Sequence, residues 1–211
     1  MRRITAAVVN QADVAALQEY SADRQSQMWE NTGGRPRRFK DELTIDLLPK
    51  QSHRCAYCCN RLMGSQPHRD HVAPKGLALH PEFTFEVRNL VLACYYCNSE
   101  RKGETDTIAE KFPQYELCRF TIVHPILDNP NDHLQFVGHR RDILIQAVNG
   151  SAKGQTTIDL FDLASANQSK ARAKDALFDA DVAHLQGRWK RLLEQVAFAA
   201  LPRHQVLRFR S

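Results

Sequence analysis

Two paired-cysteine motifs constrain the fold of this 211-residue chain more than any other feature. The first is Cys55-Ala-Tyr-Cys58 and the second is Cys94-Tyr-Tyr-Cys97. Each C-x2-C pair presents two thiolates from one tight turn, and two such pairs supply the tetrahedral set that zinc prefers. The spacing therefore predicts a structural Zn²⁺ held by these four cysteines. Because the protein fills all four positions, this zinc is not expected to be catalytic.

The segment between the pairs is longer than in a plain zinc ribbon, and it contains the candidate site residues. These are Asp70 and His71, then Asn89 at the head of an apolar run, with Asn98 just after the second pair. A histidine can act as a base near pH 7, and an aspartate is a hard oxygen ligand. In an extended chain these two neighbours point to opposite sides.

Over residues 55–103, roughly 50 positions, the chain resembles the HNH nucleases, the zinc-bound branch of the His-Me finger (ββα-metal) families. The resemblance implies that His71 is the general base for DNA phosphodiester hydrolysis. It also implies that Asp70 and Asn98 bind a catalytic Mg²⁺ or Mn²⁺. Asn89 would fix the loop that carries the histidine. Many HNH proteins have His at the position of Asn98, and an amide oxygen is a weaker ligand than a carboxylate.

Several other polar residues near the motif have two open interpretations. Lys75 and Lys102 are candidates for holding the nucleic-acid backbone, or they are ordinary exposed lysines. The basic cluster of residues 35–40 either meets phosphate or forms a solvated face. Histidines without partners in the motif, and cysteines outside the pairs, are expected to be structural or solvated. They are His68, His80, His139, Cys59 and Cys118.

A narrower resemblance spans most of the chain. Its motifs are Met-x-x-Ile at the start, Cys-Ala-Tyr-Cys, Asn-Leu-Val-Leu-Ala-Cys and His-Pro-x-x-Asp-Asn-Pro. They are similar to those of stand-alone HNH proteins of bacterial anti-phage systems, including the nuclease subunit of Septu-type systems, which works with an ATPase. The chain departs from that group at Asp70-His71-Val72, where the group often has Glu-His-Phe. The resemblance implies DNA cleavage in antiviral defence with an ATPase partner.

The predicted fold is α+β: a central zinc-clamped ββα-metal (HNH) finger with N-terminal helices, a small C-terminal β hairpin and a long C-terminal helix. Residues 1–50 form the N-terminal helical segment, with helices over 12–30 and from Asp41 to Leu48. Residues 51–110 form the HNH module. One strand is expected to end near His71, and a second is expected to cover residues 83–93. A short helix is expected to follow from Tyr95 to Arg101.

Residues 111–211 form a C-terminal α/β extension. Strands are predicted over Asp142–Val148 and Thr156–Phe161, on either side of the turn at Asn149-Gly150-Ser151. A long amphipathic helix is predicted over 170–200, with one apolar stripe from Phe178 to Val196. That stripe either packs within its own chain or docks a partner protein or DNA.

Composition and charge limit the classes of function that the chain can have. The net charge is +5, and seven Lys and Arg face four Asp and Glu within residues 51–103, which permits nucleic-acid binding. The N-terminus lacks the apolar run of a signal peptide, and no stretch is long enough for a membrane span. We therefore expect a cytoplasmic protein with reduced thiols and no membrane contact.

Two function classes remain open from the sequence. The first is a metal-dependent HNH endonuclease that cuts DNA. The second is a non-catalytic zinc module that binds nucleic acid or a protein partner. The two differ in whether Asp70, His71 and Asn98 converge on one metal position.

Overall fold

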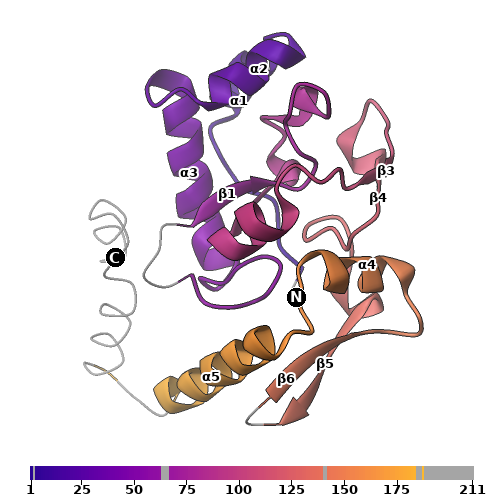
Figure 1. Cartoon of the computed structure of the whole chain (residues 1–211). Coiled ribbons are helices and arrows are strands. Elements are labelled where there is room, and N and C mark those ends of the chain that lie inside the picture. The colour runs from indigo at the N-terminus through magenta and orange to yellow at the C-terminus, as the bar shows by residue number, and fades with distance from the viewer. Residues whose placement is uncertain (2, 63–66, 140–141, 184–186, 188–211) are drawn as a thin grey trace.

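The computed structural model describes residues 1, 3–62, 67–139, 142–183 and 187. Its mixture of helices and two-stranded antiparallel sheets confirms the α+β class. Figure 1 shows the N-terminal helices at the upper left, the two strands β5 and β6 with helix α5 at the bottom, and the cysteine-bearing finger between them.

Three helices form the N-terminal segment: α1 (Gln11–Gln18), α2 (Ala22–Trp29) and α3 (Gly34–Lys50). The single helix expected over 12–30 is therefore split in two. The helix expected from Asp41 begins seven residues earlier, at Gly34. Gly33 is extended and serves as its N-cap, and Pro36 lies near the N-terminus of the helix, where its missing N–H is not needed. The basic cluster of residues 35–40 thus lies on α3.

A two-stranded sheet and a short helix make up the finger. Strand β1 (His68–His71) pairs with β2 (Leu90–Ala93), with His71 opposite Leu90. Helix η3 (Tyr96–Lys102) follows in π-helical geometry and ends at Gly103, whose φ of +49° favours glycine. The predicted strand–strand–helix order is present.

The returning strand of the finger is shorter than the predicted 83–93. The chain before it forms two 3-10 turns, η1 (Pro81–Phe83) and η2 (Val87–Asn89). The Asn89 side chain donates to the Phe83 carbonyl and folds this stretch back on itself. Backbone groups that the side chain occupies in this way do not enter a ladder.

The C-terminal extension contains a hairpin, but with other strands than predicted. A small sheet of β3 (Ile108–Glu110) and β4 (Arg119–Phe120) comes first. Strand β6 (Asp142–Ala147) then pairs with β5 (Leu134–His139). The prediction of a strand over 156–161 is wrong, because these residues belong to α4 (Ala152–Leu160) and its C-cap.

Local chemistry explains helix α4. The Ser151 hydroxyl accepts from the Gly154 N–H at 3.0 Å and caps the helix. The buried residues are Gly154, Thr157, Ile158 and Phe161. Their spacing of three, one and three is the period of a helix and not of a strand.

The long C-terminal helix is described only as α5 (Ala166–Ala183). Most of the predicted apolar stripe, from Leu185 to Val196, and the basic end from Arg188 to Arg210 lie outside the described residues. At the described end of the stripe, the Arg61 guanidinium lies 4.5 Å from the centre of the Phe178 ring. Within the described residues, the helices lack the length and apolar character that a membrane span requires.

One hydrophobic cluster draws side chains from all three predicted segments. Strand β2 lies at its centre, since all four of its residues are buried. Burial on both faces of a strand requires cover from both sides. The largest fully buried members include Leu17, Phe39, Leu43, Tyr57, Leu90, Leu92, Ile122, Phe161 and Leu163.

The close approach of α4 to the chain before β5 generates a stability prediction. A Cβ at Gly154 would overlap the His133 carbonyl oxygen, so Gly154→Ala is expected to lower the free energy of unfolding by about 1–3 kcal/mol. Gly76→Ala is the matched control, because its Cβ would meet only flexible side-chain atoms, those of Leu79 at 3.4 Å and Glu104 at 3.9 Å. Urea denaturation measures both. Equal stability of the two variants would contradict the close packing.

Candidate metal centre and neighbouring site

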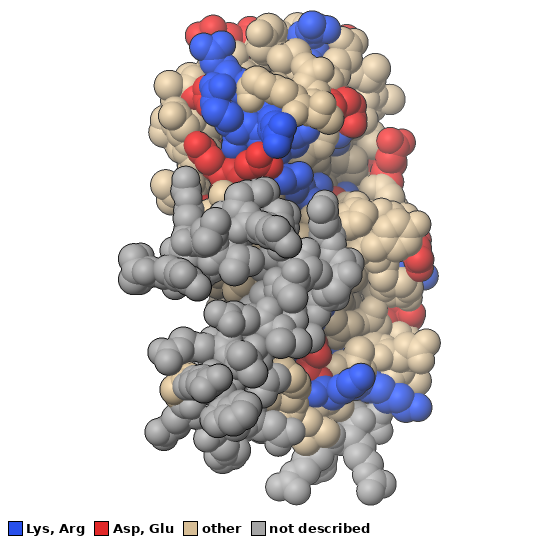
Figure 2. All heavy atoms as spheres, turned by 90° about the vertical axis from the view of Figure 1, so that its left-hand side faces the viewer, with Lys and Arg blue, Asp and Glu red and all other residues tan. Residues whose placement is uncertain are grey.

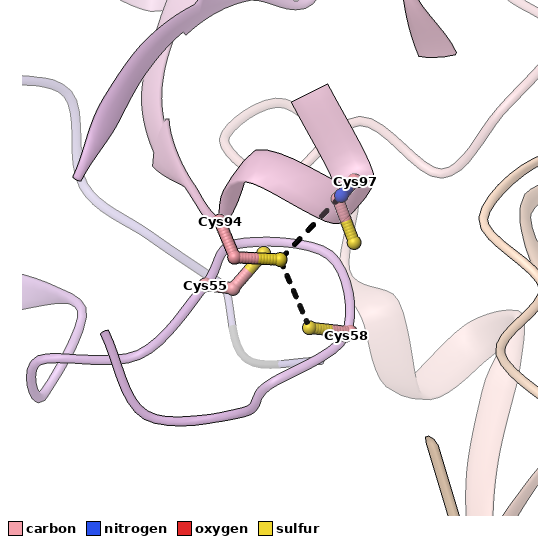
Figure 3. Close-up of side chains that lie close together, drawn as sticks. All are labelled: Cys55, Cys58, Cys94 and Cys97. Atoms are coloured by element: carbon pink, nitrogen blue, oxygen red, sulfur yellow. Dashed lines mark hydrogen bonds between the residues drawn. The ribbon is translucent and has the colours of Figure 1, made fainter. Parts of the chain in front are cut away.

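The four paired cysteines lie together, as predicted. Their sulfur atoms are all within 4.8 Å of one another, and the sulfurs of Cys58 and Cys94 are 3.8 Å apart. Figure 3 shows the side chains pointing toward a common centre. A tetrahedral zinc with bonds of about 2.3 Å separates its sulfurs by roughly 3.8 Å. The residues therefore fit a zinc ion, and the cluster could bind one.

The two cysteine turns come from different elements. The first follows α3 and is closed by a β-bridge between Arg54 and Arg61. The second joins β2 to η3. The buried Gln51 side chain links them, because its amide donates to the carbonyls of Arg54 and Leu92 and accepts from the Leu92 N–H, each at 2.8 Å. No role was predicted for Gln51, and its only signal in the sequence is an amide side chain shortly before the first cysteine pair.

Hydrogen bonds among the thiols shift the pKa values of the cysteines in different directions. The pKa of Cys94 is held far below its usual range by hydrogen bonds, first from Cys55 and then from Cys58 and Cys97. The pKa of Cys97 is raised, first by its hydrogen bond with Cys55. Zinc ligands must be thiolates, so metal binding would release the remaining protons.

Asp70 lies on the face of β1 that is turned toward η3, and its side chain is buried. Its Oδ2 accepts from the Tyr57 hydroxyl at 2.5 Å, and its Oδ1 accepts from the Lys102 ammonium at 3.1 Å. The side chains of Lys102 and Asp70 are only 2% and 4% exposed. Burial, and then the Asp70 carboxylate, raise the pKa of Tyr57 well above its usual value. Asp70 thus already has a cationic partner, and Lys102 is not presented to solvent phosphate.

His71 lies on the opposite face of β1 and is 5% exposed. Its Nε2 is 3.0 Å from the Thr84 carbonyl, which can only accept, so Nε2 carries the proton and Nδ1 keeps its lone pair. The Trp29 ring packs against the imidazole with centroids 4.3 Å apart. Burial lowers the pKa of His71, the hydrogen bond with Thr84 opposes this shift, and the charges of Lys102 and Lys75 add to it, so that the pKa is about 3. The ring is therefore neutral at pH 7.

Asn89 is fully buried beside the loop that follows His71. Its amide donates to the Ala73 carbonyl at 3.0 Å, and its oxygen accepts from the Ala73 N–H at 2.7 Å. The Tyr115 hydroxyl donates to the same oxygen at 2.8 Å and lies 2.8 Å from His124 Nε2. Asn89 therefore ties down the loop at the place where the resemblance puts a loop-fixing residue. The sequence offered no signal for Tyr115, and His124 appeared there only as the first residue of the His-Pro-x-x-Asp-Asn-Pro motif, without a role.

Asn98, on η3, meets a residue that the sequence analysis treated as structural or solvated. Its Nδ2 is 3.3 Å from His68 Nδ1 and 3.3 Å from the Ser99 hydroxyl. His68 is two positions before Asp70 and so shares its strand face. The structure thus pairs Asp70 with Lys102 and Asn98 with His68 between β1 and η3, while His71 lies across the strand.

The other predicted phosphate-binding groups are at least partly exposed, and they are paired with acidic side chains. Lys75 contacts Glu30 at 2.9 Å, and its side chain is 26% exposed. Arg35 and Arg38 of α3 both pair with Asp13, and their side chains are 59% and 57% exposed. In Figure 2, Lys and Arg side chains gather in the upper part of the face, with acidic side chains around them. These cations form a solvated, partly neutralised face that phosphate could reach.

Comparisons with known proteins do not assign the chain to a family. A scan against protein-family models finds no match for the chain, and a search of curated proteins finds no relative. What stands is a mixed α+β fold with a four-cysteine cluster that could bind zinc. Any activity is therefore a proposal from side-chain geometry.

The cysteine cluster leads to a prediction about zinc binding, for which the neighbouring Cys59 provides the control. We expect one zinc per chain, and Cys58→Ser should lose it together with much of the stability, because zinc binding supplies folding free energy. Cys59→Ser should keep the zinc, since Cys59 lies outside the cluster, with its sulfur 4.0 Å from the Tyr57 carbonyl oxygen. Elemental analysis and thermal unfolding measure both. Folded wild-type protein free of zinc would remove the clamp.

Buried His71 generates a pH prediction. Its folded pKa of about 3 is below the usual 6.5, so its contribution to stability is complete above pH 6.5 and is lost as the pH falls toward 3. His124 acts in the same direction, since burial lowers its pKa to about 3 as well. Denaturation at several pH values should show that the free energy of unfolding declines less steeply with falling pH in His71→Asn than in wild type. The difference in slope should correspond to about one bound proton. Equal slopes would mean that His71 is not buried as described.

Proposed function

We propose that this chain is a metal-dependent endonuclease of the HNH kind that hydrolyses DNA phosphodiester bonds. The observation that carries the proposal is the state of His71, a neutral imidazole whose Nε2 is fixed by the Thr84 carbonyl and whose Nδ1 lone pair remains. This histidine ends the first strand of a strand–strand–helix unit built on a four-cysteine cluster. Those are the parts that the resemblance to HNH nucleases calls for.

In this proposal each residue has one role. His71 takes a proton from the attacking water through Nδ1, and Asn89 holds the loop that keeps the ring in place. The zinc at Cys55, Cys58, Cys94 and Cys97 is structural, because it has no open position. Asp70 and Asn98 are the ligands proposed for Mg²⁺ or Mn²⁺. That cation, when bound, would neutralise charge on the phosphate and the leaving oxygen.

The Asp70–Lys102 pair sets a condition on this mechanism. The carboxylate is buried and accepts from both Tyr57 and Lys102. A carboxylate has about four lone-pair positions, so it can add a cation without losing both donors. The buried ammonium must move aside or share the oxygen, because two cations on one oxygen repel each other.

DNA would approach through its phosphates. Lys75 and the α3 arginines offer salt-dependent contacts of that kind, which carry no base specificity. Lys102 is less suited to this role than the sequence indicated, because it is buried. A role in anti-phage defence and an ATPase partner remain predictions that rest on the narrower sequence resemblance alone.

A second function is favoured by a specific observation. His71 is covered by Trp29, and Asp70 already has a protein cation. A non-catalytic zinc module that binds nucleic acid or a protein partner needs neither residue to be open. In that case the polar groups of β1 only specify the packing of the finger.

Substitution of His71 separates the two functions. His71→Ala should lower the rate of plasmid cleavage with Mg²⁺ or Mn²⁺ by roughly 10²–10⁴-fold, because a positioned base is lost. Zinc content should not change, since His71 is not a thiolate ligand. His133→Ala is the matched control, because His133 contacts the Ser151 hydroxyl beside α4 and not the finger. Cleavage that survives His71→Ala unchanged would leave the zinc-module function standing.

A further inference from the structure

His68 and Asn98 bring two metal-binding side chains together from different elements. His68 begins β1 and Asn98 lies on η3, and His68 Nδ1 is 3.3 Å from the Asn98 amide. The Tyr95 ring packs against the imidazole in a T-shaped arrangement, with centroids 5.6 Å apart. Both side chains are only partly buried, so a hydrated cation can reach them.

The chemistry of this contact depends on which end of the amide faces the ring. With Nδ2 toward His68 the contact is an ordinary hydrogen bond to Nδ1. After a rotation of the amide by half a turn, Oδ1 faces Nδ1, and the two atoms can hold between them either the proton of the Nδ1–H tautomer or a cation. Neighbouring ligands in an octahedral site, with bonds of about 2.1–2.3 Å, are roughly 3.0–3.3 Å apart. The observed separation therefore already suits two ligands of one ion.

We propose that His68 is a ligand of the catalytic cation, bound through Nδ1 beside Asn98 Oδ1 and on the same strand face as Asp70. This inference rests on the proposed nuclease function for its biological meaning, but the ion site is defined by these residues alone. An imidazole ligand favours Mn²⁺ or Co²⁺ over Mg²⁺, which prefers oxygen. The Lys102 ammonium donates to the neighbouring Asp70 carboxylate.

Direct metal binding tests the proposal without DNA. Zinc-loaded protein is titrated with Mn²⁺, and free Mn²⁺ is followed by electron paramagnetic resonance. We expect one Mn²⁺ per chain in wild type, binding at least about 10-fold weaker in His68→Ala, and unchanged binding in the control His133→Ala. Asn98→Asp should bind Mn²⁺ more tightly than wild type, because a carboxylate of the same shape replaces the amide. Equal Mn²⁺ affinity of wild type and His68→Ala, or no Mn²⁺ binding by wild type, would overturn the proposal.

The failure of this site and the failure of the nuclease function have different signatures. Wild type that binds Mn²⁺ through His68 but does not cleave DNA would support the site and contradict the function. Wild type that cleaves DNA, with both cleavage and Mn²⁺ binding retained in His68→Ala, would contradict the site alone.

Arg172 of α5 is a separate anomaly, because it is a buried cation without an acidic partner among the described residues. It is 4% exposed. Its Nε and Nη2 donate to the carbonyls of Ile143 and Leu163 at 2.9 and 2.6 Å, while Nη1 is buried and has no partner in the described part of the chain. A buried charge that lacks a counter-charge is strongly unfavourable.

The first cysteine turn is one source of negative charge that acts on Arg172, and the Asp179 carboxylate lines the same cavity. Arg172 lines a cavity of about 290 Å³ together with Cys55 and Cys59. Burial lowers the pKa of Arg172, and negative charge at Cys59 and Cys58 raises it. Four thiolates outweigh the two positive charges of a zinc ion, so a loaded cluster is an anion. We propose that Arg172 is the counter-cation of the zinc–thiolate cluster and a positioning residue for the metal.

Helix α5 also contacts the first cysteine turn directly. The Asn60 amide donates to Gln168 Oε1 at 2.7 Å, and the Arg61 N–H donates to the Asp175 carboxylate at 2.7 Å. The same Asp175 oxygen accepts from Arg54 at 3.2 Å. The charge of Arg172 would therefore link zinc binding to the docking of the C-terminal helix.

Neutralising Arg172 should affect zinc-loaded and zinc-free protein in opposite directions. In Arg172→Met we expect zinc release to a chelator to be roughly 10–100-fold faster than in wild type. In Arg172→Lys we expect the rate of zinc release to return most of the way to the wild-type rate. The zinc-loaded Met variant should unfold at a lower temperature than wild type, because the anionic cluster loses its counter-charge. The zinc-free Met variant should unfold at a higher temperature, because an unpaired charge is gone. Unchanged zinc release, or an equal loss of stability in both forms, would mean that Arg172 only packs.

Discussion

The convergence of four thiols from two distant turns is the constraint on which the rest of the structure depends. It brings Cys58 and Cys94, 36 positions apart, to a sulfur separation of 3.8 Å. Strand β1 and the loop that Asn89 fixes lie inside the segment closed in this way, so the clamp positions both faces of the candidate site. Closure of such a loop costs chain entropy, which a metal–thiolate bond set can offset. The Gln51 amide adds a second link between the same two turns.

The finger also contains several buried polar side chains. Asp70, His71 and Asn89 are each nearly inaccessible, and each makes at least one hydrogen bond through its side chain. Satisfied polar networks in a low-dielectric interior hold their members rigidly and specify one arrangement. Rigidity of this kind suits a catalytic constellation, but the same burial makes His71 a weak base, since an efficient base has a pKa near the working pH. A phosphate close to the ring would raise the pKa of His71 through its negative charge.

Two errors of the sequence analysis have a common physical origin. Residues 156–161 carry Thr and Ile, which favour strands, yet the buried positions 154, 157, 158 and 161 follow the helical period. Residue type was given more weight there than periodicity. The helix predicted from Asp41 begins instead at Gly34, because Gly33 serves as its N-cap. In both places the capping residue would have located the helix start.

The sequence by itself determined the cysteine cluster, the strand–strand–helix order around it and the position of Asn89, because each of these depends on spacing within one short segment. Only the tertiary structure decided which side chains meet. Lys102 reaches Asp70 across 32 positions, Asn98 meets His68 across 30, and α5 reaches Arg61 across 114. Such pairs depend on how helices pack against strands, and packing is set by the shapes of many side chains at once rather than by any local pattern. The cover of Trp29 over His71 arises in the same way, since α2 is placed by the shared core and not by the motif.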